Sequence, residues 1–177
     1  MVKLVKNSAL CFFVAALAVS ANAYSATAEV TWQAPDDYTD VRAANENRAR
    51  FKERTFKTLD EYFAKLAEKL PEEQTLVITV TDLDLAGQVW PSSFVFGNGM
   101  GSDVRIIKRV DIPRIVFSYT LKDGAGNEIK SANVNLKDMG FLENSRLVAQ
   151  SDNLAYEKAM IKDWFRDEMA DVTVKNL

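Results

Sequence analysis

Residues 75–85 have the sequence TLVITVTDLDL, and this stretch decides the fold. It is rich in β-branched residues, and its apolar and polar side chains follow the two-residue period of a β-strand. One face would carry Leu76, Ile78, Val80, Asp82 and Asp84, and the other Val77, Thr79, Thr81, Leu83 and Leu85. Because apolar residues fall on both faces, the pattern predicts an interior strand that is covered on both sides.

A long amphipathic helix is predicted just before this strand, over residues 45–70. Its apolar face recurs at three- and four-residue steps: Phe51, Thr55, Leu59, Tyr62, Phe63, Leu66 and Leu70. We expect Asn45 to cap its start and Pro71 to end it. With a short first strand at Val30–Trp32, this helix and the strand at 75–85 predict a βαβ unit.

The second half of the chain predicts a hairpin and a second helix. Residues 114–122 alternate, residues 123–127 contain turn residues, and residues 128–136 return as the partner strand. Residues 103–110 are expected to be extended. Residues 151–153 offer caps for a final helix of about 15 residues.

These elements predict one α/β domain over residues 24–170, with an α+β variant as the alternative. The expected order is β-α-β-loop-β-β-β-α, with a mixed sheet of four or five strands and both long helices on one face. Residues 171–177 are expected to fray. The loop in this order is residues 86–102, where no period is visible and four glycines occur.

Residues 1–23 have the features of a cleaved export signal. Lys3 and Lys6 provide the positive start, residues 9–19 are apolar, and Ala21 and Ala23 form the small-x-small pattern that precedes cleavage. The apolar run is shorter than the roughly 20 residues that a spanning helix needs. We therefore expect a periplasmic protein with no transmembrane anchor in its mature chain.

The composition excludes several chemistries. The sequence has no histidine, and its one cysteine, Cys11, lies in the expected signal. A Ser-His-Asp triad, a cysteine nucleophile, a structural zinc site and ordinary haem ligation are therefore excluded, and no cofactor is expected. The net charge of −3 argues against nucleic-acid binding, which favours a basic surface.

Asp82 and Asp84 are the first candidate site. Two residues apart on a strand, they leave the same face, near an edge where crossover sheets often bind ligands. They could hold Ca²⁺ or Mg²⁺, or act as an acid–base pair. The alternative is structural, with one carboxylate capping the next loop and the other pairing with Arg105, Arg109 or Arg114.

The other candidates are an aromatic loop and a basic helix half. Trp90, Phe94 and Phe96 could dock a partner or a ligand from the loop at 86–102, or they could pack as a small satellite core. Several basic residues at the start of the first helix could bind an anionic envelope component, such as a lipopolysaccharide phosphate or a cell-wall carboxylate, or they could form a solvated face. They are Arg42, Arg48, Arg50, Lys52, Arg54 and Lys57.

Four stretches taken in order carry a family resemblance: LVITVTDLDLAG (76–87), PRIVFSY (113–119), LKDMGF (136–141) and YEKAMIKDWF (156–165). From about Val30 to Phe165 the chain resembles the domain-of-unknown-function family numbered 3016, found in exported proteins of Gram-negative proteobacteria. The resemblance implies a periplasmic location and a single domain, and it implies no activity.

Export and the missing catalytic side chains favour a binding role over catalysis. We expect a small binding or accessory module that acts through contacts with a periplasmic or envelope protein. The alternative is a carboxylate-based metal-binding protein or hydrolase centred on Asp82 and Asp84. A third alternative is a purely structural domain.

Overall fold

The computed structural model describes residues 25–97, 101–143 and 152–173. The elements are β1 (Thr27–Trp32), α1 (Arg48–Ala67), β2 (Thr75–Asp84), β3 (Gln88–Trp90), α2 (Ser92–Phe96), β4 (Val104–Ile106), β5 (Arg114–Lys122), β6 (Glu128–Lys137) and α4 (Ala155–Glu168). One sheet has the strand order β1-β2-β5-β6, and β3 pairs with β4 in a second, two-stranded sheet. The structure is therefore a single α+β domain built on a mixed sheet, as predicted. The predicted export signal at residues 1–23 lies outside the described residues.

The main sheet contains the two predicted supersecondary units. β1 runs parallel to β2, as a βαβ unit requires, and β5 is antiparallel to both β2 and β6. The β5–β6 turn is closed by Asp123, whose Oδ1 accepts the backbone N–H groups of Ala125 and Asn127 at 2.9 and 2.8 Å. The predicted hairpin is therefore confirmed.

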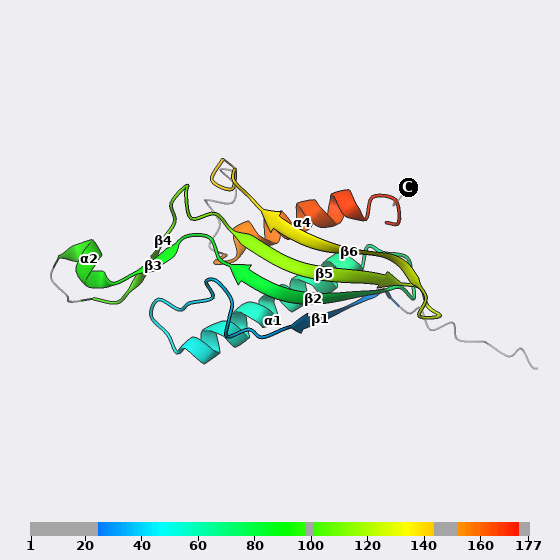
Figure 1. Ribbon diagram of the computed structural model, residues 1–177, viewed down its shortest axis with the longest axis horizontal. Coiled ribbons are helices and arrows are strands. Elements are labelled where there is room, and N and C mark those ends of the chain that lie inside the picture. Colours follow the sequence, from blue (N-terminus) through cyan, green and yellow to red (C-terminus); the bar gives the residue numbers. More distant parts are fainter. Residues whose placement is uncertain (1–24, 98–100, 144–151, 174–177) are drawn as a thin grey trace, which may run out of the picture.

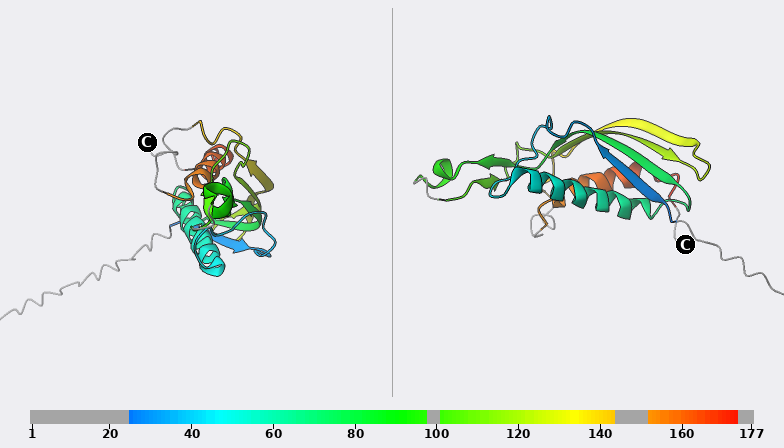
Figure 2. Two further views of the ribbon diagram at one scale, coloured as in Figure 1. Left: turned by 90° about the vertical axis from the view of Figure 1, so that its left-hand side faces the viewer. Right: turned by 90° about the horizontal axis from the view of Figure 1, so that it is seen from below.

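Both long helices lie on the same face of the main sheet, as predicted (Figures 1 and 2). α1 packs on β1, α4 packs on β6, and the two helices contact each other. The centre of this core is Phe117 of β5, whose ring lies 6.2 Å from that of Phe63 on α1 and 4.8 Å from that of Trp164 on α4. One aromatic side chain thus joins all three elements.

The prediction that β2 is covered on both sides is wrong. Leu76, Ile78 and Val80 are buried under the helices, whereas Val77 and Thr79 are only half-buried on the opposite face. Because both helices cover one side, the described residues leave the other side of the sheet open to solvent. Val77 and Thr79 are β-branched, and such side chains fit the half-buried, pleated surface of a strand without full burial.

A β-bulge also changes the predicted faces of β2. Its pairing register with β5 shifts between Val80 and Asp82, and the residue between them, Thr81, is exposed. Side chains beyond a one-residue shift move to the other face of a strand. Leu83 therefore enters the core, and Asp82 and Asp84 lie on the open face. The predicted common face of these aspartates with Val80 is wrong.

The first helix begins two residues later than predicted. Asn47, and not Asn45, is its N-cap, and the Asn47 side-chain oxygen accepts the N–H groups of Ala49 and Arg50 at 3.0 and 3.2 Å. At the final helix, Asp152 accepts the N–H of Leu154 at 3.0 Å, one residue before α4. Asparagine was predicted correctly as the residue type of the α1 cap, but two residues too early. The predicted cap of the final helix at 151–153 is wrong, because the N-cap of α4 is Leu154, whose side chain makes no capping hydrogen bond.

Residues 86–102, expected to be a loop, contain β3 and α2. Together with β4 they form an arm, which we define as these three elements, and it projects beyond the end of the main sheet (Figure 1). Gly87 starts the arm with a φ of +78°, and a Cβ there would lie 2.5 Å from the carbonyl oxygen of Ile106. Only glycine fits this turn without displacing the backbone of β4.

We predict that Phe117→Ala lowers the free energy of unfolding by about 3–5 kcal/mol, because it removes the ring that joins both helices to the sheet. The matched control is Phe94→Ala, since Phe94 is 78% exposed on α2. That substitution should change stability by no more than about 0.5 kcal/mol. Urea unfolding measures both values, and similar losses for the two variants would contradict this account of the core.

Candidate functional site

Arg105 of β4 holds the arm to the body of the protein. Its Nη1 donates to Asp40 Oδ2 at 3.0 Å and to the Gly87 carbonyl at 2.9 Å, and its Nη2 donates to the Arg42 carbonyl at 2.9 Å. These bonds join the arm to the segment before α1. The structure therefore gives Arg105 an ion pair with Asp40 rather than with Asp82 or Asp84.

Asp82 and Asp84 have different surroundings. Both oxygens of Asp82 accept from Thr39, one from its backbone N–H and one from its hydroxyl, each at 2.8 Å. Asp82 thus caps the segment before α1 and not the loop after β2. Burial raises the pKa of the Asp84 carboxyl above its ordinary value, while the positive charge of Arg114 acts in the opposite direction.

A metal site at these aspartates stays a prediction. Among the described residues, no three carboxylate, histidine or cysteine side chains are grouped so that they could hold a metal ion. Thr39 donates hydrogen bonds to both oxygens of Asp82.

Within the described residues, no helix is long and apolar enough to cross a membrane.

The structure separates the three predicted aromatic residues. Trp90 lies half-buried on β3, which pairs with β4 to form what we call the stem of the arm. The Lys108 ammonium group is 3.9 Å from the Trp90 ring centroid. Phe94 and Phe96 lie on α2 at the tip of the arm and are 78% and 59% exposed. Of the three predicted aromatic residues, Phe94 and Phe96 are exposed enough to contact a partner protein.

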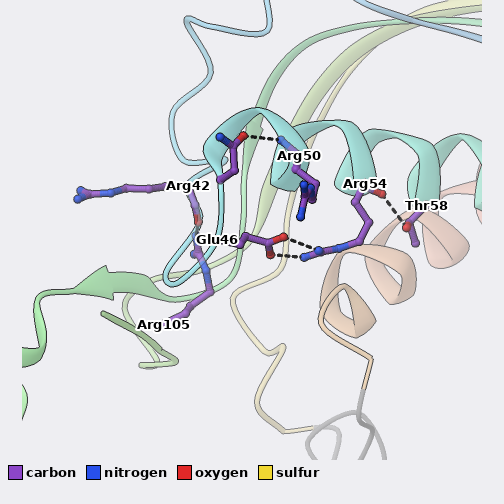
Figure 3. Close-up of polar contacts among 7 residues, drawn as sticks. Arg42, Glu46, Arg50, Arg54, Thr58 and Arg105 are labelled. Carbon is purple, nitrogen blue, oxygen red and sulfur yellow. Dashed lines mark hydrogen bonds and ion pairs between the residues drawn. The ribbon is translucent and has the colours of Figure 1, made fainter. Parts of the chain in front are cut away.

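Three of the six residues of the predicted basic helix half are engaged in ion pairs. Lys52 contacts Asp36 at 2.7 Å, and Lys57 lies 4.0 Å from Glu61. Arg54 binds Glu46 through two parallel hydrogen bonds of 2.6 and 2.5 Å (Figure 3). The side chain of Arg42 points away from this last pair in the same view.

The Arg54–Glu46 pair lies at a cleft of about 730 Å³. This cleft, which we call the α1–α4 cleft, is lined by the segment before α1, the first half of α1, the chain just after β2, β4 and the residue after it, and the start of α4. Its lining comprises Arg42, Ala44, Asn45, Glu46, Phe51, Arg54, Thr55, Thr58, Leu85, Ala86, Arg105, Ile107, Asp152, Asn153, Leu154 and Tyr156. The basic helix half and the arm therefore meet at one concave surface.

Glu157 of α4 is a buried acid that the sequence analysis missed. Its side chain is 1% exposed, and its Oε1 accepts the backbone N–H of Ala86 at 2.8 Å. Its Oε2 has no hydrogen-bond partner within the described residues. Burial raises the pKa of Glu157 to about 7, against the opposing effects of the Ala86 hydrogen bond and the charge of Arg105.

A sequence signal for Glu157 did exist. Leu154, Glu157, Ile161 and Trp164 follow one another at steps of three, four and three residues, which places the acid on the apolar stripe of α4. A charged residue on such a stripe is unusual unless it has a partner. Here the partner is a backbone group at the base of the arm, more than seventy residues away in sequence.

The chain belongs to a family described as a protein of unknown function, DUF3016, whose family model matches residues 26–167. The resemblance found in the sequence is thereby confirmed. No curated protein and no solved structure matches the chain.

We predict a pH effect that is specific to Glu157. Its pKa rises on folding from 4.5 to about 7, so the folded protein holds more protons than the unfolded chain between these values. The free energy of unfolding should therefore decrease as pH rises through this window. Glu157→Gln stays neutral and can still accept from Ala86, so at pH 8 the variant should be more stable than wild type by about 1–3 kcal/mol. Near pH 4.5 the difference should vanish.

Glu168→Gln is the matched control for this prediction. Hydrogen bonds from Tyr119 and Lys130 lower the pKa of Glu168 in the folded protein. Through Glu168, the free energy of unfolding therefore rises as pH rises, which is the opposite of the effect of Glu157. Replacement of Glu168 should destabilise the protein at pH 8. Urea unfolding at several pH values measures both variants, and a Glu157→Gln variant with the wild-type pH dependence would contradict the assignment.

Proposed function

We propose that this member of the DUF3016 family is an exported binding module that docks onto a partner protein of the cell envelope through the tip of its arm. The observation that supports this most is the exposure of Phe94 and Phe96 on α2, at the end of a projecting arm (Figure 1). Large aromatic side chains are enriched at the centres of protein interfaces.

The tip has the chemistry of an interface anchor. Full burial of one phenylalanine side chain contributes about 1.5–3 kcal/mol. Residues 88–97 contain no charged side chain, so their burial against a partner requires no charge to lose its water. Arg105 already holds the stem in one position. Docking of the tip therefore costs less conformational entropy than docking of a flexible arm would.

A protein partner fits the tip better than a lipid surface does. Two phenylalanines contribute at most about 6 kcal/mol, which resembles a single myristoyl chain, and one such chain binds membranes only marginally. Stable membrane binding then needs a second signal, such as a cluster of basic residues. Residues 88–97 contain no lysine or arginine.

The proposed export is supported by residues 1–23, and we predict cleavage after Ala23. The periplasmic fraction of the native bacterium should then contain a chain that starts at Tyr24, as measured by intact mass and N-terminal sequencing. Ala23→Asp should block cleavage, because the peptidase requires a small residue at this position. A full-length wild-type chain found in the cytoplasm would contradict the export proposal.

The docking proposal predicts site-specific crosslinking. A photoreactive phenylalanine analogue at position 96 should capture the same protein reproducibly from the intact envelope, and mass spectrometry should identify it. The matched control is position 139, because Met139 is also 78% exposed but lies just after β6. Capture from position 139 alone, or of lipid rather than protein from position 96, would contradict the proposal.

A further inference from the structure

We infer that the α1–α4 cleft binds an amphiphilic anion, a carboxylate or phosphate group attached to an apolar chain. This inference goes beyond the docking proposal and uses other residues. The cleft volume of about 730 Å³ lies within the range of about 300–1,000 Å³ that is typical of small-molecule sites.

The apolar part of such a ligand has a matching surface. Leu85 and Leu154 form part of the lining, together with Phe51, Tyr156 and Ile107. Ile107 is 38% exposed, so its side chain contacts water in this state. Burial of exposed apolar surface by a hydrocarbon chain is favourable because it releases this water.

The anionic part has an anchor in Arg54. Its guanidinium group already holds the Glu46 carboxylate through two parallel hydrogen bonds (Figure 3). These bonds lower the pKa of Glu46, and the charge of Arg50 acts in the same direction. Two arginines therefore favour a negative group at this point, and the paired bonds have the geometry in which arginine recognises a carboxylate or a phosphate.

Glu46 occupies the place that we assign to the ligand anion. It lies in the segment before the Asn47 cap, so its movement leaves the hydrogen bonds of α1 intact. The two side chains are 51% and 31% exposed, so water competes for both partners of this ion pair. An incoming anion can therefore replace Glu46 on Arg54 without a large loss elsewhere.

Two other charged groups of the lining, Arg105 and Asp152, are already engaged, and the side chain of Arg42 points away from the Arg54–Glu46 pair (Figure 3). Arg105 donates to Asp40 and to backbone carbonyls, and Asp152 is paired with Lys158 at 2.8 Å. Arg105 therefore contributes positive charge to the lining of the cleft, but its guanidinium group is not free to bind a ligand. Because the charge of Asp152 is balanced by Lys158, its repulsion of an anion is reduced. Arg54 is the side chain that selects the ligand.

Calorimetry with the mature chain tests this inference. The probes are dodecanoate and dodecyl phosphate below their micelle concentrations, inorganic phosphate, and dodecyl maltoside as a neutral amphiphile. Both dodecyl anions should bind. Inorganic phosphate, which has no apolar chain, and dodecyl maltoside, which has no negative charge, should each bind at least about tenfold more weakly. A preference for one of the two anions identifies a carboxylate or a phosphate as the natural headgroup.

Three variants locate the site. Arg54→Gln should weaken binding of the dodecyl anions by at least about tenfold, because it removes the charged anchor. Glu46→Gln should strengthen it, because the competing carboxylate is gone. Arg166→Gln is the matched control, since Arg166 is an exposed arginine paired with Asp163 and Asp167 near the end of α4. It should bind like wild type.

Several results would overturn the inference: no binding of either dodecyl anion, equal binding of dodecyl maltoside, or a Glu46→Gln variant that binds more weakly than wild type. An Arg54→Gln variant that binds as tightly as wild type would overturn it as well. The double variant Phe94→Ala, Phe96→Ala should keep full binding of the dodecyl anions. Failure of this inference is therefore distinguishable from failure of the docking proposal.

Discussion

The packing of α1 and α4 on one face of the main sheet is the constraint on which the other features depend. Phe117 contacts both Phe63 and Trp164, so a single core joins the two helices to the sheet. Because no described element covers the opposite face, β2 must turn each large apolar side chain toward the helices. The bulge at Thr81 does this for Leu83. It also moves Asp82 to the open face, where Thr39 binds it.

The same core determines how the arm is held. α4 brings Glu157 beneath the end of β2, where it accepts the N–H of Ala86, and Arg105 fastens β4 to Gly87 and Asp40. Loss of a hydrogen bond by a buried polar group is energetically costly, so these contacts hold the base of the arm in one position. The rings of Phe94 and Phe96 remain exposed at its tip. A fixed base and an exposed apolar tip are the combination that a docking element requires.

Periodicity predicted the parts of the fold whose side chains repeat. The helix face from Phe51 to Leu70 and the strand at 114–122 were predictable because the burial of their apolar residues follows their spacing. The bulge was not predictable, because VTDLDL alternates equally well whether or not one residue is inserted into the pairing. Glu157 was missed although it interrupts the apolar stripe of α4, since its partner Ala86 is distant in sequence. The arm has no period because Gly87, Arg105 and the Lys108–Trp90 contact hold it through individual interactions.

The central claim is that the tip of the arm binds a partner protein through Phe94 and Phe96. The most direct measurement is the dissociation constant between the purified mature chain and the captured envelope protein. The account predicts that replacing both phenylalanines by alanine raises this constant by at least about tenfold, as expected for interface hot spots, while the free energy of unfolding is unchanged. An unchanged dissociation constant in this stable double variant would contradict the account.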